Sequence, residues 1–303
     1  MASMNLPNLQ GVNLEETKKL LSNTFKHNTH TIYVWSGFLS VSFIVYFVLS
    51  SGDFSFLLTY AAFMRCFGFC VLNYRMWSVK SAKGISVKTL EIYMVTFVVR
   101  LLSIMRHQGY LPFDKTGDWF YHAVECMSLV SVAVAIYGVF GPLISTYDEK
   151  YDKFGNLHVP NEFGIVFLVA PCIIFAIIMH PNLNREWFSD TCWALSMYLE
   201  AVAMIPQIYM FQHQARDLGG VLDAMIGHTV FALGFSRVFE LIFWVGSFKE
   251  LADASGSKSP GYIVLFSQLG HLVIMGDFFY YYLKSLSKGL PMELPTHNFN
   301  SYV

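Results

Sequence analysis

The chain contains eight long apolar segments, each close to the length of about 20 residues that crosses the hydrocarbon core of a bilayer as a helix. Charged residues make up 14% of the 303 residues, far below the roughly 25% that is usual in soluble domains. Within a bilayer, backbone polar groups must be satisfied inside the segment, so the pattern predicts an all-α polytopic membrane protein. The segments lie at 31–50, 54–74, 89–105, 119–140, 163–180, 188–212, 228–247 and 261–284.

Seven charged residues interrupt these apolar segments, namely Arg65, Arg100, Glu125, Glu200, Arg237, Glu240 and Asp277. Each costs at least about 2.5 kcal/mol near the bilayer centre unless it is paired or hydrated. Three positive charges against four negative ones would suit structural ion pairs, and that interpretation stays open for any single residue. For the set as a whole, we favour a water-filled binding cavity.

Several functional classes are disfavoured by the residues present. The basic residues are dispersed, so the chain lacks the positive patch of a nucleic-acid-binding protein. Its five cysteines lie in apolar segments without the spacing of a metal site. No nucleophile, base and orienting group occur together. We therefore expect no enzyme activity, no metal, no cofactor and no nucleic-acid partner.

The distribution of Lys and Arg predicts the orientation in the membrane. Twelve basic residues flank the segments on one side and five on the other, so both termini are expected in the cytosol. The first apolar segment reads as an anchor that remains in the mature protein. Residues 1–30 would form a cytosolic segment, in which Asn13-Leu14-Glu15-Glu16 resembles a capping box. An interfacial helix and a disordered stretch are both open there.

Four stretches resemble the KDEL receptor family, the ER lumen protein-retaining receptors, over residues 56–295: KGIS, WALSMYLEAVAMIPQ, GHTVFALGFSR and GDFFYYYLK. The resemblance implies a seven-helix core like that of SWEET and PQ-loop transporters, in which a linker helix joins two three-helix bundles. This receptor-like domain would occupy residues 54–285. An extra N-terminal transmembrane helix would lie at 31–50 and a cytosolic tail at 286–303.

The resemblance also implies a set of ligand-binding residues. Arg100 matches the arginine that contacts the ligand's C-terminal carboxylate, and a guanidinium can hold a carboxylate through two parallel hydrogen bonds. Asp190 and Trp193 match the acidic and Trp positions that receive the signal's lysine. Without the resemblance, these two residues would be better explained by a charge at a helix N-terminus and an interface tryptophan. Arg237 and Trp244 match positions that form and line the cavity.

Further positions are implied for the polar core and its switch. Glu200 matches an acid of the proton-linked switch, and Asp277 matches an acid that holds the last helix. His228 matches a family position in the HxxFALG stretch, although a satisfied interfacial histidine is the simpler explanation. Pro206-Gln207 resembles the proline hinge of such bundles, because proline lacks a backbone donor.

The chain also departs from the family pattern in its polar core. Arg65 stands at the position of the histidine associated with pH sensing, and Glu240 replaces a tyrosine beside Arg237. Losing cavity arginines while gaining Glu240 makes the pocket less complementary to an acidic tail. The other replacements are Leu58 and Ser247 for arginines, Leu101 and Ser236 for tyrosines, and Ser103 for an aspartate.

The leading hypothesis is a receptor that binds KDEL- or HDEL-like C-terminal tails of lumenal ER proteins and returns them from the Golgi to the ER. It would reside in ER and Golgi membranes, with COPI-type coat components as cytosolic partners, although Lys284 and Lys288 do not form the family's lysine pair. The alternatives are a small-molecule transporter of SWEET-like architecture and a trafficking adaptor that has lost signal binding.

Overall fold

The structure, a computed structural model, describes residues 29–156, 160, 163–218, 220–288 and 292–294, and these residues are almost entirely helical. Residues 1–28 of the predicted segment 1–30 and most of the predicted tail therefore lie outside the described residues. The helices are α2 (Thr29–Leu49), α3 (Phe56–Val79), α4 (Val87–Ile104), α5 (Phe120–Phe140), α6 (Val166–Ile178), α7 (Trp187–Val202), α8 (Ile205–Leu218), α9 (Ala224–Gly246), α10 (Phe248–Ser255) and α11 (Ser259–Lys288). Two short 3-10 helices are η1 (Gln108–Tyr110) and η2 (Ile144–Thr146), and β1 (Val221–Leu222) pairs antiparallel with β2 (Met292–Glu293).

The helices confirm the prediction of an all-α polytopic membrane protein. Six of the described helical spans are long and apolar enough to cross a bilayer: Thr31–Leu49, Phe56–Val79, Phe120–Phe140, Trp187–Asp217, Ala224–Gly246 and Ser259–Lys288. The other two predicted segments are also helical. Helix α4 carries Lys88, Glu91 and Arg100, which lower its hydropathy. Helix α6 has only 13 residues, fewer than the expected span at 163–180.

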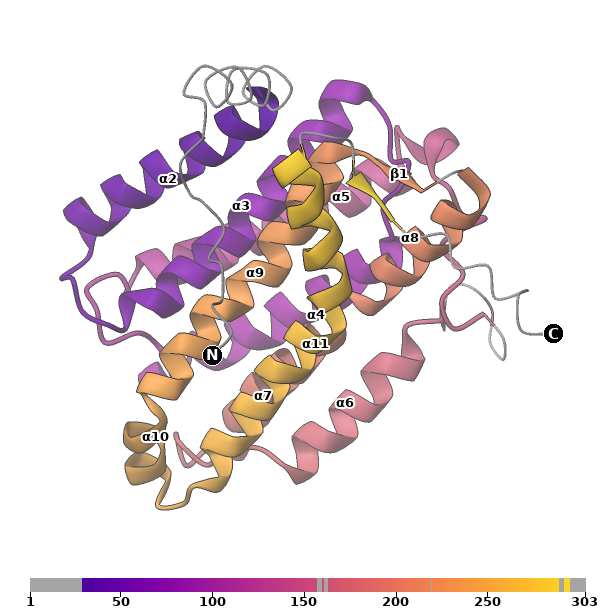
Figure 1. The fold of residues 1–303 in the computed structure, drawn as a ribbon. Coiled ribbons are helices and arrows are strands. Elements are labelled where there is room, and N and C mark those ends of the chain that lie inside the picture. Colours follow the sequence, from indigo (N-terminus) through magenta and orange to yellow (C-terminus); the bar gives the residue numbers. More distant parts are fainter. Residues whose placement is uncertain (1–28, 157–159, 161–162, 219, 289–291, 295–303) are drawn as a thin grey trace, which may run out of the picture.

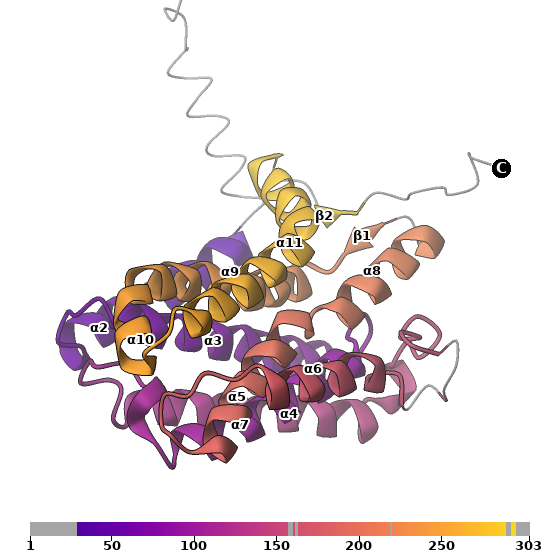
Figure 2. The same ribbon diagram turned by 90° about the horizontal axis from the view of Figure 1, so that it is seen from below.

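The long helices pack in two groups of three. In one group α5 contacts both α3 and α4, and in the other α11 contacts both α7 and α9. The groups meet where α3 runs along α9 and α4 runs along α7. Figure 2 shows α3 between α9 and α5, and Figure 1 shows α6 at the edge of the bundle, where it contacts α7.

The first helix, α2, packs on the outside of this core along α3 (Figure 1). Phe38 is buried in a small cluster with Met64 of α3 and Ala232 of α9. Trp35 donates a hydrogen bond from Nε1 to the Tyr282 hydroxyl of α11, at 3.3 Å. The beginning of α2 and the end of α11 therefore lie at the same end of the bundle.

The predicted segment 188–212 is divided into α7 and α8 beside Pro206, because proline cannot donate the backbone hydrogen bond that would continue a helix. The next residue, Gln207, joins the break to the turn before α4. Its Oε1 accepts from the Ser86 backbone N–H at 2.9 Å, and its Nε2 donates to the Gly84 carbonyl at 2.9 Å. The Gln207 N–H donates to Thr89 Oγ1 at 3.0 Å. This end of the bundle is thus closed by a polar seam.

Candidate ligand site in the helical core

Three arginines and three glutamates from five helices meet in the middle of the bundle. None of the six is more than 6% exposed, and their formal charges sum to zero. They are Arg65 on α3, Arg100 on α4, Glu125 on α5, Glu200 on α7, and Arg237 and Glu240 on α9. We refer to these six residues as the ion cluster.

Arg65 lies at the centre of the ion cluster. Its Nη2 is 2.5 Å from Glu125 Oε1, and its Nη1 is 2.7 Å from Glu200 Oε1 and 2.8 Å from Glu240 Oε1. The guanidinium also lies over the Phe97 ring, 5.8 Å from its centroid. One arginine therefore connects the acids of three different helices.

The other two arginines complete the network. Arg100 pairs with Glu200 through Nη2 and approaches Glu125 Oε1 at 3.3 Å through Nη1. Arg237 pairs with both Glu200 and Glu240. Gln268 of α11 donates from Nε2 to Glu240 Oε2 at 2.8 Å. Glu200 consequently contacts all three arginines, which makes it the most connected acid of the cluster.

Such dense pairing is what buried charges require, because an unpaired charge in a low-dielectric interior is strongly unfavourable. The space beside the cluster has a volume of only about 20 Å³, room for roughly one water molecule. The expectation of a water-filled cavity is therefore wrong for this conformation. The wall of this small pocket is formed by Leu58, Arg100, Tyr110, Tyr121, Trp193, Ser196, Met197, Arg237, Glu240, Trp244 and Gln268.

Aromatic rings cover the pocket at the end of the bundle away from Gln207. Tyr110 of η1 stacks on Trp193, with ring centroids 4.1 Å apart and an interplanar angle of 8°. Trp193 in turn meets Trp244 edge to face at 5.6 Å. Both predicted tryptophans thus lie together over Arg100 and Arg237, as lining residues of one pocket.

Asp190 is completely buried beneath this aromatic cover. Its Oδ1 accepts from the Tyr110 hydroxyl at 2.9 Å and from Asn184 Nδ2 at 3.0 Å, whereas its Oδ2 has no hydrogen-bond partner among the described residues. Burial, followed by the charge of Asp190 and the hydrogen bond to it, raises the pKa of Tyr110. The neutral phenol therefore remains a hydrogen-bond donor to Asp190.

The structure separates two of the expected core residues from the ion cluster. His228 is buried near the start of α9, where its ring nitrogens contact Thr31 Oγ1 at 3.0 Å and the Tyr282 hydroxyl at 2.7 Å. Asp277 is exposed on α11. The prediction that His228 and Asp277 belong to the polar core is therefore wrong, because both side chains lie on helix faces that point away from Glu200.

Other residues join the site although the sequence had not assigned them to it. Glu125 was recognised as an intramembrane charge only, yet it bridges Arg65 and Arg100. Gln268 could be recognised from the sequence, because a polar amide inside an apolar segment needs a hydrogen-bond partner. Tyr110 carries no such signal, since it lies between two apolar segments, in η1, and reaches Trp193 only through tertiary packing.

Two of the departures from the family pattern compensate each other. Arg65 and Glu240 are in direct contact at 2.8 Å, so the extra positive charge on α3 is matched by the extra negative charge on α9. A third departure, Ser103, donates to the Ser189 carbonyl at 2.8 Å and holds α4 against α7. No group of three or more His, Cys, Asp or Glu side chains with a metal-binding arrangement occurs in the described part of the chain.

Comparisons with known proteins agree on one family. The sequence model of the ER lumen protein retaining receptor family matches residues 81–247, more than half of the chain. An ER lumen protein-retaining receptor of Drosophila melanogaster is 25% identical over 230 residues, covering 76% of this chain and 93% of that protein. The receptor of Petunia hybrida is 28% identical over 233 residues, covering 74% and 92%. Receptor B of Arabidopsis thaliana is 27% identical over 230 residues, covering 74% and 92%.

Proposed function

The chain belongs to the ER lumen protein retaining receptor family, and from this premise we propose that it binds KDEL- or HDEL-like C-terminal tails of lumenal ER proteins. It returns these proteins from the Golgi to the ER by vesicle transport. The family is one of retention receptors and not of enzymes. The observation that carries the proposal is the pair of arginines, Arg100 and Arg237, in the wall of a small pocket that the rings of Tyr110, Trp193 and Trp244 also line.

Arg100 holds the terminal carboxylate of the tail. Its guanidinium is oriented by Ser196, whose Oγ lies 3.3 Å from Nε, and its outer nitrogens now engage Glu125 and Glu200. An incoming carboxylate takes the place of Glu200 at Arg100, because both are planar acceptors of the same pair of hydrogen bonds. Glu200 keeps Arg65 and Arg237 as partners, so the exchange leaves no arginine without an acid.

Asp190 receives the basic group of the tail. The free Oδ2 of Asp190 is a buried acceptor that an ammonium group would satisfy. Entry requires Tyr110 to leave the face of Trp193, which then offers an aromatic surface to the cation. The same movement opens the route to Arg100.

The test is peptide binding to the purified full chain, with KDEL- and HDEL-ending peptides compared with C-terminally amidated versions. We expect binding that requires the free carboxylate and is lost in Arg100→Gln. Arg106→Gln is the matched control, because Arg106 is exposed and lies over Phe188 outside the pocket. Equal binding of free and amidated peptides, or an Arg100→Gln variant that binds normally, would refute the assignment.

A trafficking adaptor that has lost signal binding is the second candidate. It is favoured by the complete neutralisation of the three arginines and by the pocket volume of about 20 Å³. Absence of binding to every peptide, in a protein that still cycles between Golgi and ER, would support it. For the SWEET-like transporter considered from the sequence, substrate flux into proteoliposomes is the corresponding test.

We propose that residues 54–285 form the receptor-like domain and that its architecture is of the SWEET type. Helices α3, α4 and α5 are one bundle, α7, α9 and α11 are the second, and α6 is the linker. In each bundle the third helix contacts both the first and the second, which supports a parallel repeat. Helix α2 is the additional span at 31–50.

We further propose that both termini face the cytosol in ER and Golgi membranes. The common end of α2 and α11 supports this orientation, as does the excess of Lys and Arg on one side of the apolar segments. Arg75 pairs with Asp223 at 3.1 Å at this end. COPI-type coat components bind on the same side.

A further inference from the structure

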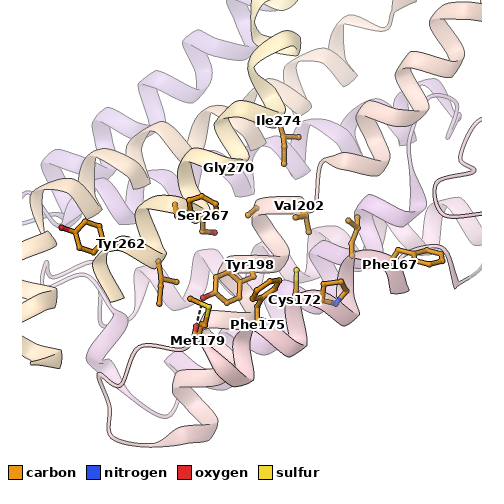
Figure 3. A pocket seen from close by; sticks show the side chains of 15 residues that line it. Phe167, Cys172, Phe175, Met179, Tyr198, Val202, Tyr262, Ser267, Gly270 and Ile274 are labelled. Carbon is orange, nitrogen blue, oxygen red and sulfur yellow. Dashed lines mark hydrogen bonds between the residues drawn. The ribbon is translucent and has the colours of Figure 1, made fainter. Parts of the chain in front are cut away.

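The described helices also line a space that is much larger than the pocket at the ion cluster. A groove of about 590 Å³ lies between α6 and α11, with α7 as its floor. Figure 3 shows the side chains of Cys172 and Phe175 from α6, Tyr198 from α7 and Ser267 from α11 around one space. It has the volume of a site for one small ligand and is too small for a partner helix.

The lining of this groove is almost entirely apolar. Two of its few polar groups already donate hydrogen bonds to backbone carbonyls. The Tyr198 hydroxyl donates to the Met179 carbonyl at 2.6 Å, and the Ser267 hydroxyl donates to the Met197 carbonyl at 3.3 Å. A water-filled site would need several free polar partners, and a peptide would need acceptors and donors for its backbone. Hydrocarbon is the only chemistry that this lining satisfies.

The groove opens sideways, toward the surface of the bundle that the bilayer covers. Phe175 of α6 is 55% exposed and Phe266 of α11 is 80% exposed at its edges. Along α11 the lining extends from Tyr262 to Ile274, which is about 18 Å at 1.5 Å per residue. One leaflet of the hydrocarbon core is about 15 Å thick, half of about 30 Å. The groove therefore matches a single acyl chain in its length and its direction of access.

From this geometry we propose that the groove between α6 and α11 holds one acyl chain of a bilayer phospholipid. The chain lies in the leaflet nearer the beginning of α11, between the aromatic rings of α6 and the small residues of the opposite wall. Gly270 leaves the space for it, because a Cβ at this position would meet no atom within 4 Å.

The bound chain packs against α7, which carries Glu200, and against α11, whose Gln268 contacts Glu240 of the ion cluster. Ser267 faces the groove, whereas the adjacent Gln268 faces Glu240. Ala201 likewise lines the groove, next to Glu200 on the inner side of α7. A single helix wall thus separates the lipid from the acids, and occupancy of the groove stabilises that wall from outside.

The test uses the full chain in nanodiscs made with a phosphatidylcholine that carries a diazirine in one acyl chain. After irradiation, we expect labelled peptides to concentrate at groove residues such as Phe175 and Tyr262. Gly270→Trp should lower this labelling severalfold because the indole fills the groove. Gly276→Trp is the matched control on the same helix, since a Cβ there also meets no atom within 4 Å but Gly276 is outside the groove lining.

Thermal unfolding of each variant establishes that it is folded, and Gly270→Leu serves as a smaller replacement if the Trp variant is not. Labelling spread evenly over the exposed faces of α2 and α6, or unchanged by a folded Gly270 variant, would overturn the proposal. Cross-links between two chains at Phe175 would overturn it as well, because they would assign the groove to a second copy.

Discussion

At the scale of single residues, charge neutrality organises the centre of this protein. Arg65 and Glu240 both differ from the residues that the family resemblance implies, yet they contact each other within a cluster of zero formal charge. Either change alone would leave one uncompensated charge among buried side chains. The two residues are therefore best understood as one unit.

A double-mutant cycle tests this pairing. Removing one partner, in Arg65→Met or Glu240→Met, should destabilise the protein by about 3–5 kcal/mol because an unpaired buried charge remains. The double variant keeps two positive and two negative charges, so it should recover much of that loss. Thermal unfolding in detergent measures the coupling. The exposed pair Lys150 and Asp217 is the control, with an expected coupling below about 1 kcal/mol. Additive losses at Arg65 and Glu240 would contradict the pairing.

Arg65 also determines how tail binding should respond to acidity. A guanidinium stays protonated throughout the range in which histidine titrates, so this position contributes the same charge at about pH 5.5 and pH 7.4. We therefore expect the charge at position 65 to cause little change in tail affinity between these two pH values. In Arg65→His combined with Glu240→Tyr, the imidazole gains its charge only in acid, so binding of the acidic tail should become tighter as pH falls. Equal pH dependence of both proteins, measured by peptide titration, would refute this role.

At the scale of helices, the break between α7 and α8 is held by Gln207. Its side chain and backbone N–H make three hydrogen bonds to the turn and first residues of α4. Because the break ends α7 immediately after Val202, it also determines where Glu200 and Ala201 stand. The hinge predicted at Pro206-Gln207 is thus fixed by hydrogen bonds in this conformation.

Gln207→Ala should show how much the hydrogen bonds of Gln207 contribute to the stability of the protein. The substitution leaves the Ser86 N–H and the Gly84 carbonyl buried without their partner, so we expect a loss of about 2–4 kcal/mol from two such groups. Gln214→Ala on the same helix is the control, since Gln214 makes one 3.3 Å bond to Asp148. Similar melting temperatures for the two variants would show that the hydrogen bonds of Gln207 contribute little to stability.

Helix α2 should be attached to the core by its inner face only. Phe38 is 3% exposed and packs between Phe63 and Phe67, whereas Phe43 is 64% exposed. A side chain that packs inside a bilayer is not transferred from water, so Phe38→Ala removes only packing contacts. We therefore expect it to lower the free energy of unfolding by less than the roughly 3–5 kcal/mol that the same change costs in a soluble core. Phe43→Ala should leave thermal unfolding unchanged. Equal effects of both substitutions would mean that α2 is not docked as described.

At the scale of the whole molecule, the proposed extra helix would change which side of the membrane the N-terminus occupies. If all eight apolar segments cross the bilayer, as we propose, a tag placed before α2 and a tag after α11 should both be accessible to protease from the cytosol in intact vesicles. Deleting residues 1–50 should move a tag before α3 to the lumen and leave the tag after α11 in place. Protection of both tags in the intact chain would contradict the proposed orientation.

Local information in the chain was sufficient for the helical architecture. Each apolar segment must satisfy its own backbone in the bilayer, so length and composition predict where helices form, and a proline such as Pro206 predicts where one is interrupted. The same reasoning identified Arg100, Glu200, Arg237 and Glu240 as costly charges that require partners. These are properties of a residue and its neighbours in sequence.

Tertiary structure alone decided which of those charges meet. Asp277 and Glu125 are both acids in apolar segments, yet only Glu125 faces the bundle interior, because the rotation of each helix depends on its packing partners. His228 serves the attachment of α2, through contacts almost 200 residues apart in sequence. The groove beside Gly270 likewise arises only where three helices come together. Determining such features requires distances between segments, and the order of residues along one chain does not contain them.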